Sequence, residues 1–428
     1  MKSVQFLLLT LTALTGLTFQ SCLKDKCERT VSYIRVEPVY KTLEEIHAGQ
    51  VVQEAPRAMK NPGQLYFYND LIFINERREG IHIIDNSNPE NPVNFAFISI
   101  PGNDDLAIKN GILYANSYVD LLSISLQNYQ LLSRVENVFP PLWMDIENNK
   151  VAVYYEETPV TEVMDCDSYG KLYRSNGVFI DFADLSFGGV QEDIASQIGS
   201  NSSSGGTGIG GSMARFTIVG DYLYVVDQTS MDVFGLQAPT QPVLANTVNI
   251  GWGIETIFPY QDKLFIGSNS GMFIYDNSNP LAPTQLAQFA HATACDPVVV
   301  KDNFAYVTLR NGTACQGFVN QLDLIDISSI TNPKLVASFP MDNPHGLSIK
   351  DNSLFLCEGN FGLKSFDIAD PVKLNKHLLD HEKGLHAFDA IALPGPGNLL
   401  LVVGEDGFYQ FNFDNPADLK LLSKIPVL

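Results

Sequence analysis

Short apolar runs, each closed by a polar turn, recur along most of this chain. The stretch "IHIIDNSNP", which begins at Ile81, is echoed by "MFIYDNSNP", which begins at Met272. The runs are rich in β-branched and aromatic residues, and no helical periodicity separates them. This pattern predicts many short β-strands and argues against alternating strands and helices.

Alignment of the chain on this echo gives eight units, each with four strand-like runs. The third run of each unit ends at an equivalent position, and successive positions are 40 to 56 residues apart. The eight positions are Asp85, Ser125, Asp181, Gly235, Asp276, Asp326, Asp367 and Asn412. Four strands in a unit of this length are typical of a β-propeller blade. We therefore predict an all-β fold, a single β-propeller of eight four-stranded blades, with seven blades plus an irregular unit as the alternative.

The polar residue that closes each third strand is interpreted as part of a turn. An Asp or Asn side chain accepts a hydrogen bond from the backbone N–H two residues later, and the proline that follows sets φ for the reversal. Asp85 and Asp276 are accordingly expected to end strands and not to take part in catalysis.

Three of these stretches, "IIDNSNPENP", "LIDISSITNP" and "SFDIADP", resemble the LVIVD repeat, in which an apolar run closes on Asp and a proline turn. The resemblance covers about residues 63–428, although the units with Ser125 and Gly235 depart from the Asp. It implies a secreted or lipid-anchored β-propeller of the kind found in Bacteroidetes. It implies no particular biochemical activity.

The N-terminus, "MKSVQFLLLTLTALTGLTFQSC", has a lysine, an apolar run too short to span a membrane, and then Cys22. It resembles a bacterial lipoprotein signal of the relaxed Bacteroidetes type. The resemblance implies that residues 1–21 are removed and that Cys22 is acylated, and several acyl chains give stable anchoring. We expect an exported protein, lipid-anchored to the outer membrane on its periplasmic or cell-surface side. The alternative is a plain secretory signal with an incidental cysteine.

Residues 22–60 are predicted to form a tether with one strand and a short helix. The helix would begin after Thr42, because Thr42 and Glu45 have the spacing of a capping box. We expect the stretch 31–50 to brace the ring where the first and last blades meet. The propeller would then occupy residues 61–428, with loop-like insertions at about 156–176 and 190–213 that are flexible by composition.

The charge of the chain limits the partners that it can bind. Its formal net charge is −21, with 27 basic and 48 acidic residues. Such a surface repels nucleic acids and anionic headgroups, so we expect no nucleic-acid partner and membrane contact through the lipid alone.

Sequence motifs of catalysis and of cofactor binding are lacking. The chain has no G-x-S-x-G, H-E-x-x-H or C-x-x-C, and the "GGTGIGG" tract at 205–211 leads into a strand-like run and not into a helix. We predict no cofactor and assign no catalytic residue. Asp165 and Asp167 in "DCDSYG" are a weak candidate for a calcium loop, because Tyr169 occupies a position where an oxygen ligand is usual.

The cysteines of an exported protein are free to form disulfides. Cys295 and Cys315 fall in two loops that a propeller places on the same face of one blade, and they are the candidate disulfide. The connectivity of Cys27 and Cys166 stays open. Cys357 lies within an apolar run and is predicted to be a buried free thiol.

The segments that lead into the innermost strands surround one opening of the central channel, where propellers usually bind ligands. Carboxylates, histidines and both tryptophans fall at these positions, as expected of a site for a sugar, a metal or a peptide. Equally, each residue there can simply make a local hydrogen bond within its loop. The candidate ligand-binding residues are Asp104, Trp143, Arg215, Trp252, Glu255, His291, Asp296, His345 and His386.

The sequence favours a non-catalytic module, for binding, adhesion or scaffolding of an envelope complex, whose ligand is a glycan, a peptide or an envelope protein. The alternative is a carbohydrate-active hydrolase or lyase that uses carboxylates and histidines at the channel mouth, such as Asp296 and His345.

Overall fold

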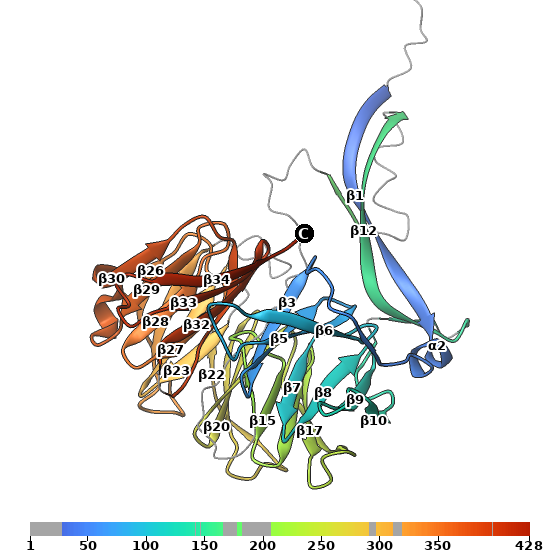
Figure 1. Cartoon of the computed structure of the whole chain (residues 1–428), viewed down its shortest axis with the longest axis horizontal. Helices are drawn as coiled ribbons and strands as arrows, with labels where there is room; N and C mark the ends of the chain where they lie inside the picture. The colour runs from blue at the N-terminus through green and yellow to red at the C-terminus, as the bar shows by residue number, and fades with distance from the viewer. Residues whose placement is uncertain are drawn as a thin grey trace, which may run out of the picture. The chain divides into compact units, whose positions relative to one another are not determined.

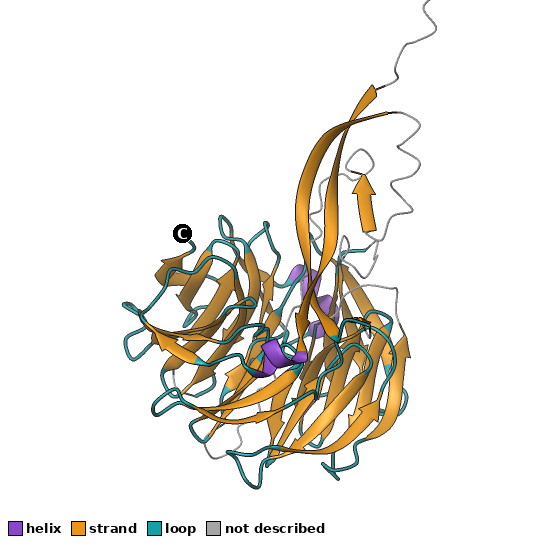
Figure 2. Ribbon diagram, turned by 90° about the vertical axis from the view of Figure 1, so that its right-hand side faces the viewer, coloured by secondary structure: helices purple, strands orange, loops and turns teal. Residues whose placement is uncertain are grey.

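The computed structural model describes residues 28–141, 143–145, 147–165, 178–181, 207–290, 297–310, 319–395 and 397–428. The chain divides into two compact units, residues 40–153 with 188–428 and residues 1–39 with 154–187. Strands dominate (Figure 2), and the helices of the described part are α2 (Leu43–His47) and the 3-10 helix η2 (Pro371–Lys376). No helix among these residues is long and apolar enough to cross a membrane.

The larger unit contains seven antiparallel sheets, which we number as blades 1 to 7 in chain order (Figure 1). In every blade the four strands pair in the order in which they occur along the chain, from the innermost strand outwards. Blades 1 to 3 are formed by β3 (Pro62–Tyr68), β4 (Leu71–Glu76), β5 (Gly80–Asp85) and β6 (Val93–Ser99); β7 (Leu106–Lys109), β8 (Ile112–Ser117), β9 (Asp120–Ser125) and β10 (Leu131–Val135); and β15 (Phe216–Val219), β16 (Tyr222–Val226), β17 (Ser230–Gly235) and β18 (Val243–Asn249).

Blades 4 to 7 repeat the same arrangement, and apolar side chains from their facing surfaces fill the space between neighbours. Blades 4 and 5 are formed by β19 (Ile254–Tyr260), β20 (Lys263–Ser268), β21 (Gly271–Asp276) and β22 (Thr284–Ala290), and by β23 (Val298–Lys301), β24 (Phe304–Leu309), β25 (Gln321–Asp326) and β26 (Lys334–Pro340). Blades 6 and 7 are formed by β27 (Leu347–Lys350), β28 (Ser353–Cys357), β29 (Leu363–Asp367) and β30 (Leu378–Glu382), and by β31 (Ala387–Ala392), β32 (Leu399–Gly404), β33 (Gly407–Asn412) and β34 (Lys420–Pro426).

The innermost strands of these seven blades form a closed ring. Each one contacts the next, from β3 through β7, β15, β19, β23 and β27 to β31, and β31 contacts β3 again. A shared core between blades 7 and 1 seals the closure, with Leu65 and Ile72 packed among Leu401, Val403 and Phe408. The predicted all-β propeller is confirmed.

The eighth sheet has the strand order β11-β12-β1-β13. The described part of the chain thus holds eight sheets, one for each of the eight sequence units. The ring contacts pass directly from β7 to β15, so this eighth sheet contributes no innermost strand. The eight sheets match the eight predicted units, and the innermost strands of seven of them close the ring. The strands of the eighth sheet are β1 (Glu28–Thr42), β11 (Trp143–Asp145), β12 (Lys150–Asp165) and β13 (Val178–Asp181).

Side chains end the third strand of each blade in the predicted way. In blades 1, 4, 5 and 6 an Asp, in blade 7 an Asn and in blade 2 a Ser accepts a hydrogen bond from the backbone N–H two residues later, at 2.8–3.3 Å. The backbone N–H of Ser87 holds the pKa of Asp85 below the usual value, and the side chain of Ser328 followed by its backbone N–H does the same for the pKa of Asp326. The DNSNP stretches are therefore turns, as expected.

The segment before blade 1 behaves as expected. Thr42 caps α2 in a complete capping box with Glu45, and β2 (Val52–Glu54) pairs with the outer edge of β6. Met59 forms a parallel bridge with Val427, and the backbone N–H of Leu428 donates to the Met59 carbonyl at 3.0 Å. Met59, which follows the residues 31–50 expected to act as a brace, therefore joins the start of the first blade to the end of the last one.

Two insertions were predicted to be flexible loops, and the structure corrects both predictions. Strand β12 continues to Asp165, so the first part of the 156–176 insertion is strand and not loop. The end of the 190–213 insertion contains β14 (Ile209–Gly210), which pairs with β3. Composition was misleading because both segments obtain their hydrogen bonds from distant parts of the chain.

Candidate functional site

Residues 207–215 follow the free edges of the innermost strands and link many blades; we call them the channel segment. Thr207 forms a bridge with Lys109 of blade 2, and β14 pairs with Phe67 and Tyr66 of blade 1. The segment then reaches blades 7, 6 and 4 before it enters β15. Its further hydrogen bonds join Gly208 N to Ile108 O, Gly211 N to Leu65 O, Ser212 to Asp389, Leu347 N to Ser212 Oγ, Ile257 N to Ala214 O, and Arg215 N to Asp105.

Glycines allow this segment to approach the strands closely. A Cβ atom on Gly208 would lie 2.3 Å from the ring of Tyr66, and one on Gly211 would lie 1.9 Å from Asp389 Oδ2. Both distances are far below a van der Waals contact, so a larger residue would push the segment away from the strands. The GGTGIGG tract thus meets a packing requirement, in agreement with the sequence argument against a phosphate loop.

Asp389 of β31 holds the middle of the channel segment. Its Oδ1 accepts from the backbone N–H and the hydroxyl of Ser212, at 2.9 and 2.7 Å. The Ser212 hydroxyl in turn accepts from the backbone N–H of Leu347 at 2.6 Å. Asp389 is 2% exposed, and this burial raises its pKa to about 8. The carboxyl group is therefore largely neutral at pH 7, as suits a group enclosed by packed backbone.

A second buried carboxyl group holds the end of the channel segment. Asp105, just before β7, accepts from the backbone N–H of Arg215 at 2.7 Å and from that of Leu106 at 2.6 Å. Burial raises the pKa of Asp105 to about 7. The two carboxyl groups whose pKa values approach neutrality thus both fix backbone, which gives them a structural role.

One face of the ring carries the loops between the second and third strands of each blade and the segments that lead into the innermost strands; we call it the mouth face. Arg77 and Arg78 follow β4, Asp104 precedes β7 and Arg215 precedes β15. Burial raises the pKa of Asp104, while the positive charges of Arg78, Arg215 and Arg77 lower it. Three guanidinium groups from two loops therefore lie close to this one carboxylate.

His345 and Arg310 extend the same group of side chains. Arg310, directly after β24, is hydrogen-bonded through Nη1 to Nε2 of His345 at 3.2 Å. A guanidinium has only donors, so Nε2 must accept and the imidazole proton is on Nδ1. Burial lowers the pKa of His345 well below its ordinary value, and the charges of Arg310, His386 and Arg77 add to this effect. His345 is accordingly a neutral donor.

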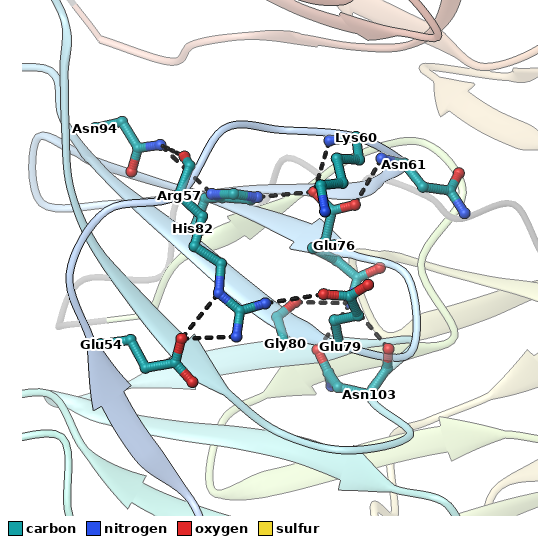
Figure 3. Close-up of polar contacts among 11 residues, drawn as sticks. Glu54, Arg57, Lys60, Asn61, Glu76, Glu79, Gly80, His82, Asn94 and Asn103 are labelled. Carbon is teal, nitrogen blue, oxygen red and sulfur yellow. Dashed lines mark hydrogen bonds and ion pairs between the residues drawn. The ribbon is translucent and has the colours of Figure 1, made fainter. Parts of the chain in front are cut away.

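Buried carboxylates hold the loops beside these arginines. Glu76 Oε1 accepts from the backbone N–H of Asn61 at 2.6 Å, and its Oε2 accepts from that of Lys60 at 3.0 Å and contacts His82 Nε2 at 2.9 Å (Figure 3). Arg57 joins Glu54 to Glu79 beside it (Figure 3). This network fixes the loop that begins at Arg77.

Blade 6 repeats this device next to His345. Glu358 accepts from the backbone N–H groups of Asp342 and Asn343, at 2.9 and 2.6 Å, and from Lys364 Nζ at 2.9 Å. The spacings of 15, 16 and 6 residues between carboxylate and partners are the same as in blade 1. Two blades of the ring thus anchor the mouth-face loops by the same chemistry.

Four of the residues predicted at the channel mouth lie within reach of one another's charges or rings. Arg215 faces Asp104, and His386 faces His345. His386 also pairs with Glu405, and both histidine rings lie against Phe388, with centroids 4.7 and 5.4 Å away. The sequence analysis thus identified part of this group correctly from the segments that precede innermost strands.

The remaining predicted site residues do not belong to this group of four, or they lie outside the described residues. Trp252, between β18 and β19, is 69% exposed, and Glu255 is half-buried in β19. Trp143 is exposed on β11, which pairs with β12. Asp165 ends β12, and the described residues contain no group of three metal-ligating side chains. Cys22, Cys27, Cys166, Asp167, His291, Cys295, Asp296 and Cys315 lie outside the described residues.

Sequence reasoning missed Arg77, Arg78 and Arg310. They lie in loops between second and third strands, which share a face with the segments that precede innermost strands. That rule was applied to Cys315 alone, and its extension to every blade would have found the arginines. Cys357 is a buried free thiol, as predicted, and burial raises its pKa.

A separate cavity of about 490 Å³ lies between blades 2 and 3. Its apolar side is formed by residues that include Leu43, Val119, Phe139 and Met144, and its polar side by Asp227 and Asp232 with neighbouring hydroxyl groups. Its lining includes the segment that follows β10 and the loop between β16 and β17.

Comparison with protein families identifies the repeat. The family model described as the LVIVD repeat matches residues 210–250 and 293–340. The chain therefore carries LVIVD repeats, and the resemblance found in the sequence is confirmed. A search of curated proteins found no match.

The solved structures that resemble this chain include the following three. The computationally designed protein Ika8 is 9% identical, with a TM-score of 0.48 over 86% of this chain and 88% of its own. BamB from Moraxella catarrhalis is 6% identical, with a TM-score of 0.48 over 89% and 98%. PorZ, a surface component of the type-IX secretion system of Porphyromonas gingivalis, is 11% identical, with a TM-score of 0.45 over 86% of this chain and 39% of its own.

Proposed function

We propose that this protein is an exported, lipid-anchored binding module that holds its ligand on the mouth face without transforming it. The observation that carries the proposal is the cluster of Arg77, Arg78, Arg215, Arg310 and His345 around the channel opening. None of these side chains belongs to the repeating pattern of the blades. Charged groups gathered beyond what the fold requires are expected at a binding site.

The channel segment supports binding over catalysis. It makes hydrogen bonds to the innermost strands of several blades, so a ligand meets the ring at its surface and not in a deep pore. Asp389 and Asp105 have the raised pKa values expected of a general acid, but each is hydrogen-bonded to backbone of that segment. A proton donor must reach the bond that it cleaves, and these two are enclosed.

Export and anchoring are proposed from the N-terminal sequence. Lys2, the apolar run and Cys22 together resemble a lipoprotein signal. Acylation at Cys22 would keep the propeller at the outer membrane, where glycans, peptides and envelope proteins are all available as ligands. A Cys22→Ser variant is expected to leave the membrane fraction and to appear as soluble exported protein. Retention of that variant in the membrane would contradict acylation at this position.

The test of binding is a melting-temperature panel on the mature protein with polysaccharides, peptides and divalent ions. A ligand that prefers the folded state stabilises it, by about 2.7 kcal/mol when the ligand concentration is one hundred times its Kd. The melting temperature rises as a result. We expect a shift with at least one class and recovery of that ligand unchanged. A shift accompanied by a cleaved product would instead establish an enzyme. Silence across the panel and in crosslinking in cells would contradict the binding module.

A further inference from the structure

The mouth face concentrates positive charge in an acidic protein. The chain has a net charge of −21 and nine arginines, and four of the nine are at this opening. Three of them lie around Asp104, and Arg310 is hydrogen-bonded to His345. Of the other carboxyl groups nearby, Asp105 is buried with its pKa raised and Glu405 is paired with His386. Four arginines of an acidic chain are thus gathered on one face of the ring.

Two buried donors at the mouth have no acceptor in the described part of the chain. They are Nε of Arg215 and Nδ1 of His345. Because His345 Nε2 accepts from Arg310, the imidazole proton is on Nδ1. The Nε atom of Arg215 always carries a proton. His345 is 3% exposed, so water supplies its Nδ1 poorly. A buried donor without an acceptor costs about 1–3 kcal/mol, and a ligand oxygen would remove that cost.

The arginine side chains are held in place from below. Arg78 has φ of 64°, a left-handed conformation that a non-glycine residue adopts only when its surroundings require it. Its backbone N–H donates to Asn103 O, and its carbonyl accepts from Gly102, both at 2.8 Å. Arg77 packs beside Gly63, where an added Cβ would lie 3.1 Å from its Cγ. These contacts hold the backbone of Arg78 and the stem of Arg77, and the planar guanidinium groups that they carry match a ligand with paired oxygens.

An exposed tryptophan on the same face indicates the rest of the ligand. Trp252 lies between Gly251 and Gly253 in the segment that leads into blade 4, and 69% of it is exposed. Blade 4 is next to blade 3, which begins after Arg215, and to blade 5, which carries Arg310. An exposed indole presents a flat apolar surface against which the C–H face of a pyranose packs, whereas a free small anion would leave it uncovered.

We propose that the mouth face binds an acidic saccharide, with the guanidinium groups on its carboxylate or sulfate oxygens and Trp252 against a sugar ring. This inference rests on the proposed binding function and names the ligand class. Uronate and sulfate groups share the chemistry that arginine recognises, which is a planar or tripodal set of oxygens with negative charge.

The experiment is a titration of the mature protein with polygalacturonate, heparin, dextran and polyglutamate. We expect polygalacturonate or heparin to bind and dextran not to bind. Binding of polygalacturonate would indicate that the site recognises a carboxylate, and binding of heparin alone would indicate a sulfate. Arg215→Gln is expected to weaken that binding about tenfold, since a hydrogen bond to a charged group is lost. Its backbone N–H to Asp105 is retained, so the fold is expected to survive. Trp252→Ala is expected to weaken saccharide binding by a similar factor.

The matched control is Lys301→Gln, which removes one positive charge from an exposed pair with Asp302 at the opposite side of blade 5. Its affinity is expected to stay within about twofold of the unmodified protein. Should Arg215→Gln fail to fold, Arg78→Asn replaces it, because Asn tolerates a left-handed conformation. The inference would be overturned if the arginine variants bound the saccharide with unchanged affinity. It would also be overturned if polyglutamate bound as tightly as the saccharide and the Trp252→Ala substitution did not change polyglutamate binding. Binding of dextran or another neutral ligand, independent of Arg215, would overturn the acidic-saccharide inference but would still support a binding module. If the protein bound no ligand at all, both the inference and the proposed binding function would be overturned.

Discussion

The two faces of the ring are built by different rules. On one face, the turns between third and fourth strands repeat the same hydrogen bond in six blades; we call it the turn face. On the mouth face, blades 1 and 6 share one carboxylate arrangement, but the channel segment makes contacts that no blade repeats. Recurring residues thus build the fold, and residues that occur once shape the mouth face.

The channel segment gives the largest expected effect, through the pKa of Asp389. The ordinary value is 3.8 and the folded value is about 8, so the folded state binds the proton more tightly. Stability from this group is therefore fully present below pH 4 and is lost as the pH rises towards 8. Relative to Asp389→Asn, which cannot ionise, the free energy of unfolding is expected to fall by about 1.4 kcal/mol per pH unit in this window. Urea unfolding of both proteins from pH 4 to 8 checks the slope, and parallel curves would contradict the assignment.

A pair of glycine substitutions separates close packing from backbone strain. Gly211→Ala places a Cβ against Asp389, and we expect a loss of about 2–3 kcal/mol from overpacking. Gly111→Ala lies at a turn with φ of 74° and open space around it, and we expect about 1 kcal/mol from the left-handed conformation alone. Urea midpoints measure both. Equal losses would mean that the channel segment is not packed as described.

The turn face was predictable from sequence, whereas the channel segment was not. The hydrogen bond of Asp85 reaches two residues ahead, and the capping box of Thr42 reaches three, so the local sequence contains both partners. Ser212 is 177 residues from Asp389 and 135 from Leu347, and nothing in a glycine-rich tract names such distant partners. Strand β12 was shortened in the prediction for the same reason, because its pairing partners lie elsewhere in the chain.

The mouth was predictable in part. Strand order fixes which loops share a face, and so Asp104, Arg215, His345 and His386 were found from their positions alone. The unit that holds Trp143 resembles a blade in its strands, yet β11 pairs with β12 and is not among the seven innermost strands of the ring. Pattern shows that a unit forms a sheet, and only the contacts between sheets show whether it joins the ring.

The turn face gives the smallest expected effect. Asp326→Ala removes an acceptor for the backbone N–H of Ser328, and because the turn is exposed the loss of stability is expected to be the smallest of those predicted here. Asp326→Asn keeps an oxygen in the same place and is expected to be nearly neutral. Thermal unfolding of the two variants measures the difference. An Asn variant as unstable as the Ala variant would indicate that charge, and not the turn hydrogen bond, matters there.

The most direct test of the account is hydrogen exchange of the mature protein with and without a ligand found in the melting-temperature panel. We predict that the ligand slows amide exchange in mouth-face segments of several blades, among them residues 76–79, 102–105, 251–254 and 343–346. Exchange at the turns that follow Asp85, Asp276 and Asp326 is predicted to stay unchanged. Protection confined to those turns, with the mouth face unaffected, would contradict the claim that the residues that do not repeat hold the ligand.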